Sequence, residues 1–127
     1  MQNMTQAYAK NAQATGSPRE LEAQLLLRAA AKLQAIKDGT PTESEGVISA
    51  IRYNRRLWLI FASAIGKPEN PLPREIKLNV ANLANFIVNH SMKLETDRLH
   101  ASDGVGILIN INREIAAGLR TERPAAA

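Results

Sequence analysis

The chain contains no cysteine, which excludes a disulfide framework and a thiolate metal site. Aromatic residues are scarce at 4% of the sequence, with one tryptophan in 127 residues. The longest apolar run, residues 57–65, is about half as long as a membrane span requires. The N-terminus also lacks the basic segment and unbroken apolar stretch of a secretory signal. These absences predict a soluble, cytoplasmic protein without membrane insertion.

The excess of positive over negative charge is also small. The net charge is +4, from 16 basic and 12 acidic residues. It indicates only a slight preference for anionic partners. The hydrophobic content of 45% is enough, at this length, for one domain with its own core.

Helical spacing of apolar residues runs through most of the chain. In SPRELE (17–22), Ser17 is an N-cap, Pro18 fits the first helical position and Glu20 completes a capping box, so a helix is predicted from here to about Ile36. Further helices are predicted over residues 43–65, 73–97 and 107–119, with a loop from His100 to Gly106 before the last. The fold class is therefore all-α: a small single-domain bundle of about four main helices over residues 17–120. Residues 1–16 form an arm or a short helix, and residues 121–127 form a disordered tail.

Two features of the predicted helix surfaces have two readings each. Leu27 lies opposite the apolar stripe of its helix, so it is either an interface residue or a singly exposed leucine. Asn82, Asn85 and Asn89 form an uncharged amide stripe, where Lys and Glu would give better helix propensity. This stripe is either a polar contact surface or an ordinary solvated face.

The segment NRRLW (54–58) sets two arginines beside the only tryptophan. Asn54 shares a helix row with Trp58, which predicts a half-buried amide that bonds to the backbone at the end of a neighbouring helix. Arg55 and Arg56 flank this row. They either bind RNA or form ion pairs inside the bundle with carboxylates such as Glu20, Glu22 or Glu114. An RNA-binding surface would require more aromatic residues than the chain has.

Residue patterns for catalysis are lacking. No nucleophile-and-base pattern and no glycine-rich phosphate loop is found. His100 has Asp97 and Asp103 at a spacing of three, but this trio spans a predicted helix end, where capping explains it. We therefore expect a binding protein without enzymatic activity, metal or cofactor.

Several short motifs occur together and in order along almost the whole chain. They are QAY (6–8), SPRELE (17–22), NRRLW (54–58), Asn70 with Leu72-Pro73, and LININ (108–112) followed by GL (118–119). In this combination the chain resembles the FlaF family of flagellar biosynthesis regulators of alphaproteobacteria. The resemblance implies a small helical protein of bacterial flagellum biogenesis and motility.

The resemblance also implies a function. FlaF proteins are needed for flagellin synthesis and secretion and operate alongside the regulator FlbT, so the expected activity is that of a flagellin-specific chaperone for type III export. The alternative is post-transcriptional regulation of flagellin expression, through mRNA or through FlbT. From the resemblance and the surplus of apolar residues, we expect partner contacts at Tyr8, Leu27, Arg55, Arg56, Trp58, Ile109 and Asn112. Ser17, Pro18, Glu20 and Asn54 are expected to be structural.

Overall fold

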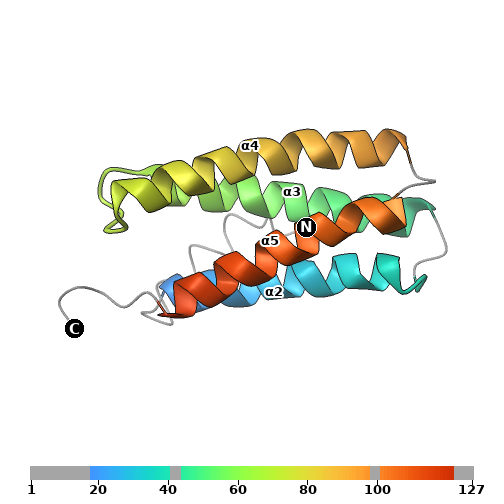
Figure 1. The fold of residues 1–127 in the computed structure, drawn as a ribbon, viewed down its shortest axis with the longest axis horizontal. Helices are drawn as coiled ribbons and strands as arrows, with labels where there is room; N and C mark the ends of the chain where they lie inside the picture. The colour runs from blue at the N-terminus through green and yellow to red at the C-terminus, as the bar shows by residue number, and fades with distance from the viewer. Residues whose placement is uncertain (1–17, 41–43, 98–100, 122–127) are drawn as a thin grey trace, which may run out of the picture.

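The computed structural model describes residues 18–40, 44–97 and 101–121, and these form four α-helices (Figure 1). The helices are α2 (Pro18–Lys37), α3 (Ser44–Gly66), α4 (Arg74–Thr96) and α5 (Ala101–Thr121). This confirms the all-α prediction, and the first three helices agree with the predicted ranges to within a residue or two. None of the described helices has the length and hydropathy of a transmembrane segment.

A glycine ends α2. Gly39 has a φ of +76°, a left-handed conformation that residues with a Cβ rarely adopt. Its N–H bonds to the carbonyl of Ile36 at 3.0 Å, and the N–H of Thr40 bonds to the carbonyl of Ala35 at 2.9 Å. These two bonds form a Schellman motif, which satisfies carbonyls at the end of the helix and turns the chain towards α3.

Asn70 shapes the connection between α3 and α4. Its Oδ1 accepts the N–H of Leu72 at 3.0 Å, and its Nδ2 donates to the carbonyl of Ala64 at 3.4 Å. Pro73 then precedes the first residue of α4 with a φ of −57°, which is compatible with the helix that follows. The amide of Asn70 therefore ties the loop to the last turns of α3.

The start of α5 corrects one prediction. The helix begins at Ala101, so Gly104 and Gly106 lie inside it rather than in a loop. A Cβ at position 104 would lie only 2.2 Å from Cδ2 of Leu94. Gly104 is thus a point of close approach between α4 and α5, and its small size serves helix packing.

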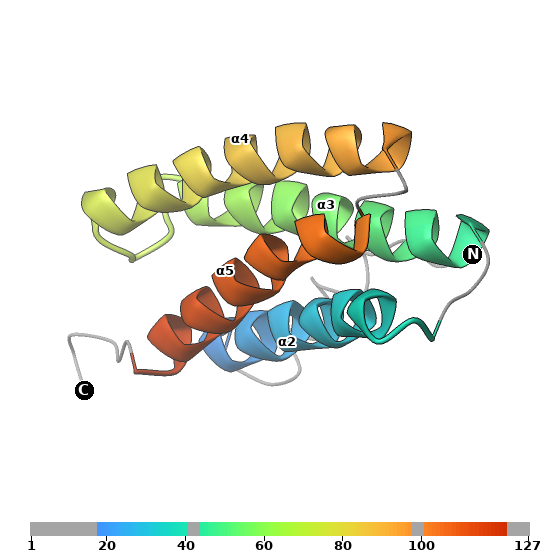
Figure 2. The same cartoon turned by 45° about the vertical axis from the view of Figure 1, so that its right-hand side comes forward.

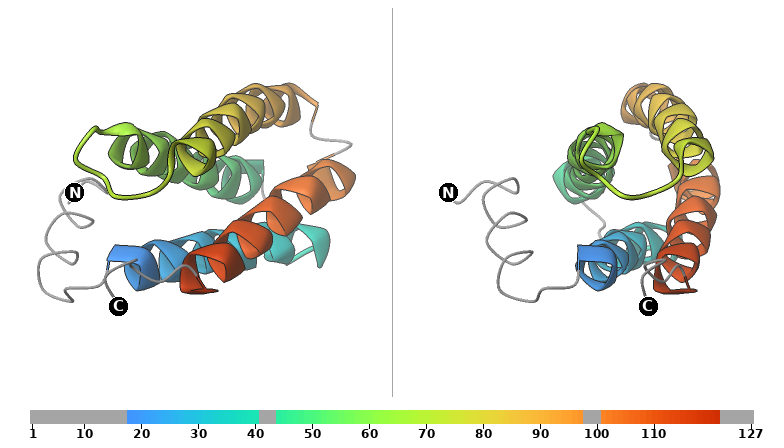
Figure 3. Two further views of the ribbon diagram at one scale, coloured as in Figure 1. Left: turned by 60° about the vertical axis from the view of Figure 1, so that its left-hand side comes forward. Right: turned by 90° about the vertical axis from the view of Figure 1, so that its left-hand side faces the viewer.

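The helices pack as two pairs around one core. α2 packs most extensively against α5, and α3 against α4. Seen along the bundle, α2 and α3 form one side, and α4 and α5 the other (Figure 3). α5 begins beside the end of α4 and runs obliquely down to α2 (Figure 2). The largest fully buried side chains come from all four helices and include Leu26, Leu33, Ile51, Trp58, Phe61, Ile87 and Leu108.

Candidate functional site

A hydrogen-bond network of polar side chains lies inside the core. The indole Nε1 of Trp58 donates to Oδ1 of Asn112 at 2.8 Å. Nδ2 of Asn112 donates in turn to Oδ1 of Asn54 at 2.7 Å and to the carbonyl of Leu26 at 3.1 Å. Trp58, Asn54 and Asn112 are completely buried. One amide therefore joins α2, α3 and α5, which are the three helices that contribute these groups.

The burial and the bonding partner of Asn54 both differ from the sequence prediction. Asn54 is fully rather than half buried, and its bonding partner is a side chain instead of the end of a helix. Its Nδ2 has no hydrogen-bond acceptor within the described part of the chain. A buried donor without an acceptor costs free energy, so this group offsets part of the stabilisation that the bonds of the amide pair provide.

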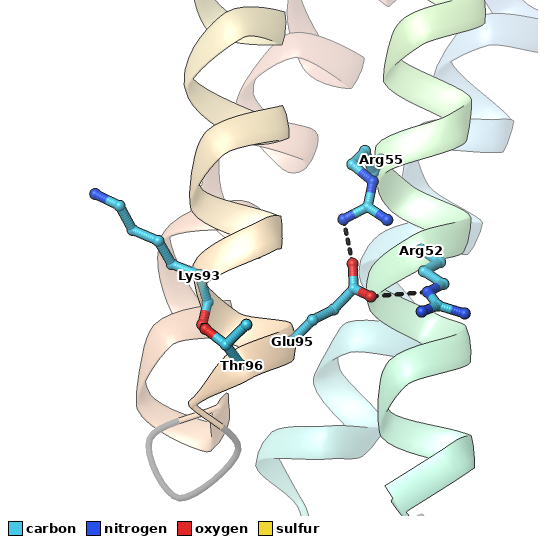
Figure 4. A network of polar contacts seen from close by, with 5 residues as sticks. All are labelled: Arg52, Arg55, Lys93, Glu95 and Thr96. Carbon is cyan, nitrogen blue, oxygen red and sulfur yellow. Dashed lines mark hydrogen bonds and ion pairs between the residues drawn. The ribbon is translucent and has the colours of Figure 1, made fainter.

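An ion cluster connects α3 to α4 near one end of the bundle. Glu95 accepts from Nε of Arg52 at 2.8 Å and from Nη1 of Arg55, and Figure 4 shows both guanidinium groups converging on this carboxylate. Partial burial raises the pKa of Glu95, but the bonds from the two arginines outweigh this effect and hold the pKa below its usual value. The expected pairing of Arg55 inside the bundle thus occurs with Glu95, and not with Glu20, Glu22 or Glu114.

A second ion pair joins the beginning of α2 to the end of α5. Glu20 accepts from Nη2 of Arg120 at 2.9 Å and from Nε at 3.1 Å. These bonds lower the pKa of Glu20. Pro18 is the first residue of α2, as predicted. Ser17 and Tyr8 lie outside the described residues.

Three of the residues expected to contact a partner are not on the surface. Trp58, Ile109 and Asn112 are buried, and Leu27 is half-buried against the core. Trp58 and Ile109 thus fill the core, because neighbouring helices cover them, and in this state a partner cannot reach them. Arg56 is exposed and forms no ion pair with any described residue, so among the predicted contact residues that the structure describes it is the freely accessible one.

The outer face of α4 carries a surface that the sequence interpretation described only in part. Leu78, Phe86 and Met92 are 53%, 39% and 56% exposed. Between and beside them lie four exposed asparagines, at positions 79, 82, 85 and 89. From Leu78 to Met92 the sequence contains no Lys, Arg, Asp or Glu. We call these seven residues the α4 face. The sequence predicted the asparagines of this surface but not its exposed apolar side chains. A helical segment of fifteen residues without a charged side chain could have indicated them.

Exposed Leu59 extends the α4 face onto α3. Arg55 bonds Glu95, and the two helices run antiparallel. Leu59 on α3 and Met92 on α4 therefore each lie about one turn from this ion pair, in the same direction along the bundle. Leu59 is 53% exposed. Large apolar side chains exposed on the same side of a protein are candidates for a site of protein interaction.

Within the described helices, no group of three or more His, Asp or Glu side chains could hold a metal ion. His90 donates from Nε2 to the carbonyl of Gly104 at 2.8 Å and stacks on Phe86 at a centroid distance of 5.2 Å. It is thus engaged in packing between α4 and α5. The trio around His100 includes a residue outside the described ranges.

Comparison with known proteins identifies the family. The family model of the flagellar protein FlaF matches residues 4–119. A search of the curated proteins finds no significant match, and neither does a search of the solved structures. The family match covers nearly the whole chain, including the buried amide network and the α4 face. The chain therefore belongs to the FlaF family of flagellar proteins.

Proposed function

We propose that this flagellar protein binds newly made flagellin in the cytoplasm, keeps it monomeric and promotes its export through the flagellar type III apparatus. The observation that carries the proposal is the α4 face, where Leu78, Phe86 and Met92 stand exposed on a helix segment without charge. The family assignment supports a flagellar role, and the surface supplies a physical means of binding.

A helix face of this kind fits the apolar side of an amphipathic helix. Export chaperones protect the aggregation-prone helical ends of a secreted subunit by offering an apolar helical surface in place of its own partner. Fully burying one exposed large apolar side chain contributes about 1.5–3 kcal/mol. These three side chains are 39–56% exposed, so each would contribute about half of that before the costs of association. The flanking asparagines would hydrogen-bond to polar groups of the bound helix, and the absence of charge avoids the desolvation of ions.

The alternative is regulation of flagellin expression through mRNA or the regulator FlbT. The observation that favours it is the exposed Arg56 with Arg52 and Tyr53 nearby on α3. Against direct RNA binding, Arg52 and Arg55 share the carboxylate of Glu95, and the aromatic side chains needed to stack bases are few. We propose a binding role without catalysis or cofactor in either case.

Calorimetric titration distinguishes the two functions. Purified flagellin is titrated into the protein at low and at physiological salt, with the flagellin leader RNA titrated in parallel. The chaperone function predicts binding to flagellin that barely depends on salt and has a negative heat capacity change, because apolar burial dominates. Binding to RNA alone, weakened about tenfold or more by physiological salt, would support the alternative.

A further inference from the structure

The cations of this protein are spread along the chain, but its carboxylates are not. Residues 23–37 and 46–66 contain six Lys or Arg and no Asp or Glu. The remaining residues contain ten cations and 12 carboxylates. The net positive charge of the protein therefore comes from the central parts of α2 and α3, which lie side by side on one side of the bundle (Figure 3).

One aromatic side chain connects the cations of the two helices. Nζ of Lys32 lies 5.0 Å from the centroid of the Tyr53 ring. Arg28 precedes Lys32 by about one turn of α2, and Arg56 follows Tyr53 by about one turn of α3. We call Arg28, Lys32, Arg52, Tyr53 and Arg56 the basic face.

The charges of the basic face are largely available to a partner. Arg28, Lys32 and Arg56 are exposed and form no ion pair with any residue that the structure describes. The side chain of Arg52 is 65% exposed although it binds Glu95. By contrast, Arg19, Arg55 and Arg120 are each paired with a glutamate. Cations that outnumber the neighbouring carboxylates produce a positive potential that attracts an anionic partner.

We propose that the basic face binds an acidic segment of a protein partner, namely an amphipathic helix whose carboxylates flank an apolar stripe. Arginine binds carboxylates with two parallel hydrogen bonds, which gives both affinity and orientation. The apolar stripe would lie on Leu25, Tyr53 and Ile60, which are partly exposed on the same two helices. The carboxylates on the two sides of the partner helix would thus bind the cations, and its central apolar stripe would contact these three side chains.

The face suits a protein better than RNA. Base stacking requires open aromatic faces, and Tyr53 is the only aromatic side chain of the basic face, with one side of its ring facing Lys32. Glu95 also neutralises part of the charge of Arg52, although it leaves Arg28, Lys32 and Arg56 free. A single-stranded RNA would therefore gain electrostatic attraction only.

This inference does not depend on flagellin binding. The basic face lies on α2 and α3, whereas the α4 face lies on the outer side of α4. Its binding test uses synthetic peptides and no flagellin, so either proposal can fail while the other holds.

The test measures binding of labelled synthetic helices by fluorescence anisotropy. One amphipathic peptide of about 20 residues carries a leucine stripe flanked by glutamates, and its matched peptide carries glutamine at the same positions. A single-stranded RNA of the same net charge is the third probe. The protein is compared with the triple variant Arg28→Glu, Lys32→Glu, Arg56→Glu. The control is the variant Lys67→Glu, Arg74→Glu, Arg113→Glu, which changes the charge equally at exposed positions elsewhere.

We expect the acidic peptide to bind at least about tenfold more tightly than the glutamine peptide. Reversal of the basic face should weaken this binding at least about tenfold, and the control variant should change it about twofold or less. The emission of Trp58 and circular dichroism verify that both variants are folded. Three results would overturn the proposal: equal binding of the two peptides, no binding of the acidic peptide at about millimolar concentration, or equal losses in the two variants. Tighter binding of RNA than of the acidic peptide, abolished by the same reversal, would assign the face to nucleic acid instead.

Discussion

Asn112 of α5 donates a hydrogen bond of 2.7 Å to Asn54 of α3, and both side chains are completely buried. The two residues are unequal members of the network. Asn112 bonds to three groups, namely Trp58 Nε1, Asn54 Oδ1 and the carbonyl of Leu26, whereas among the described residues the side chain of Asn54 bonds to Asn112 alone. The consequence of removing each amide should therefore differ.

Asn112→Ala should lower the free energy of unfolding by about 3 kcal/mol or more, because each buried group left without a partner costs about 1–3 kcal/mol. Asn54→Ala should cost less, about 1–2 kcal/mol, since Nδ2 of Asn112 retains the Leu26 carbonyl and an unsatisfied Nδ2 is removed at the same time. Urea unfolding followed by the emission of Trp58 measures both. An equal or larger loss in Asn54→Ala would contradict the assignment of Asn112 as the centre of the network.

Glu95 should make stability depend on pH in the acidic range. Its pKa is lower in the folded protein than the ordinary 4.5, so the ionised carboxylate stabilises the fold above that pH, and the contribution is lost as pH falls through the folded pKa. Glu95→Gln should cost about 1 kcal/mol at pH 7, and the difference from wild type should shrink below pH 4.5. Unfolding by urea at a series of pH values measures this.

The matched control for that experiment is Glu75→Gln on the same helix. Glu75 is exposed and forms no ion pair with a described residue, so its substitution should change the free energy of unfolding by less than about 0.5 kcal/mol at every pH. Some pH dependence should persist in Glu95→Gln, because Arg120 also lowers the pKa of Glu20. If the free energy of unfolding of Glu95→Gln stays below that of wild type by the same amount from pH 7 to below pH 4.5, the ionic role of Glu95 would be refuted.

Alanine substitutions at two glycines of α5 should change the stability of the protein in opposite directions. Gly118 is exposed and has no atom within 4 Å of an added Cβ, so Gly118→Ala should stabilise the protein by about 0.5 kcal/mol through better helix propensity. A Cβ at Gly104 would meet Cδ2 of buried Leu94 at 2.2 Å, so Gly104→Ala should destabilise by about 1–3 kcal/mol. Thermal unfolding of the two variants measures the sign, and a stabilising Gly104→Ala would show that α4 and α5 do not approach closely there.

The helices were largely predictable because their signals are local. Pro18 and Gly39 mark the start and the end of α2 within a few residues of sequence, and the spacing of apolar residues predicts the helix between them. The start of α5 was missed for the same reason. Gly104 and Gly106 have the local signature of a loop, and only the approach of Leu94 from another helix explains a glycine within α5.

The candidate sites depend on which helices become neighbours, and the sequence does not state this directly. The row of Asn54 and Trp58 follows from helical spacing, but their shared partner Asn112 is more than fifty residues away. Ile109 was expected at a partner surface and is buried because α5 packs along α2. Conversely, Leu78 and Met92 remain exposed because no described helix covers the outer side of α4.

The most direct test of the proposed function is calorimetric titration of flagellin into a variant of the α4 face. Leu78→Glu with Met92→Glu places two charges on this surface at positions that are more than half exposed, so the fold should be kept. Asn110→Glu with Ala117→Glu is the matched control at exposed positions of α5. We predict that the first variant binds flagellin at least about tenfold more weakly than wild type, because charges would be buried against an apolar helix, and that the control binds as wild type does. Unchanged binding by the folded Leu78→Glu, Met92→Glu variant would contradict the assignment of the α4 face as the flagellin-binding surface.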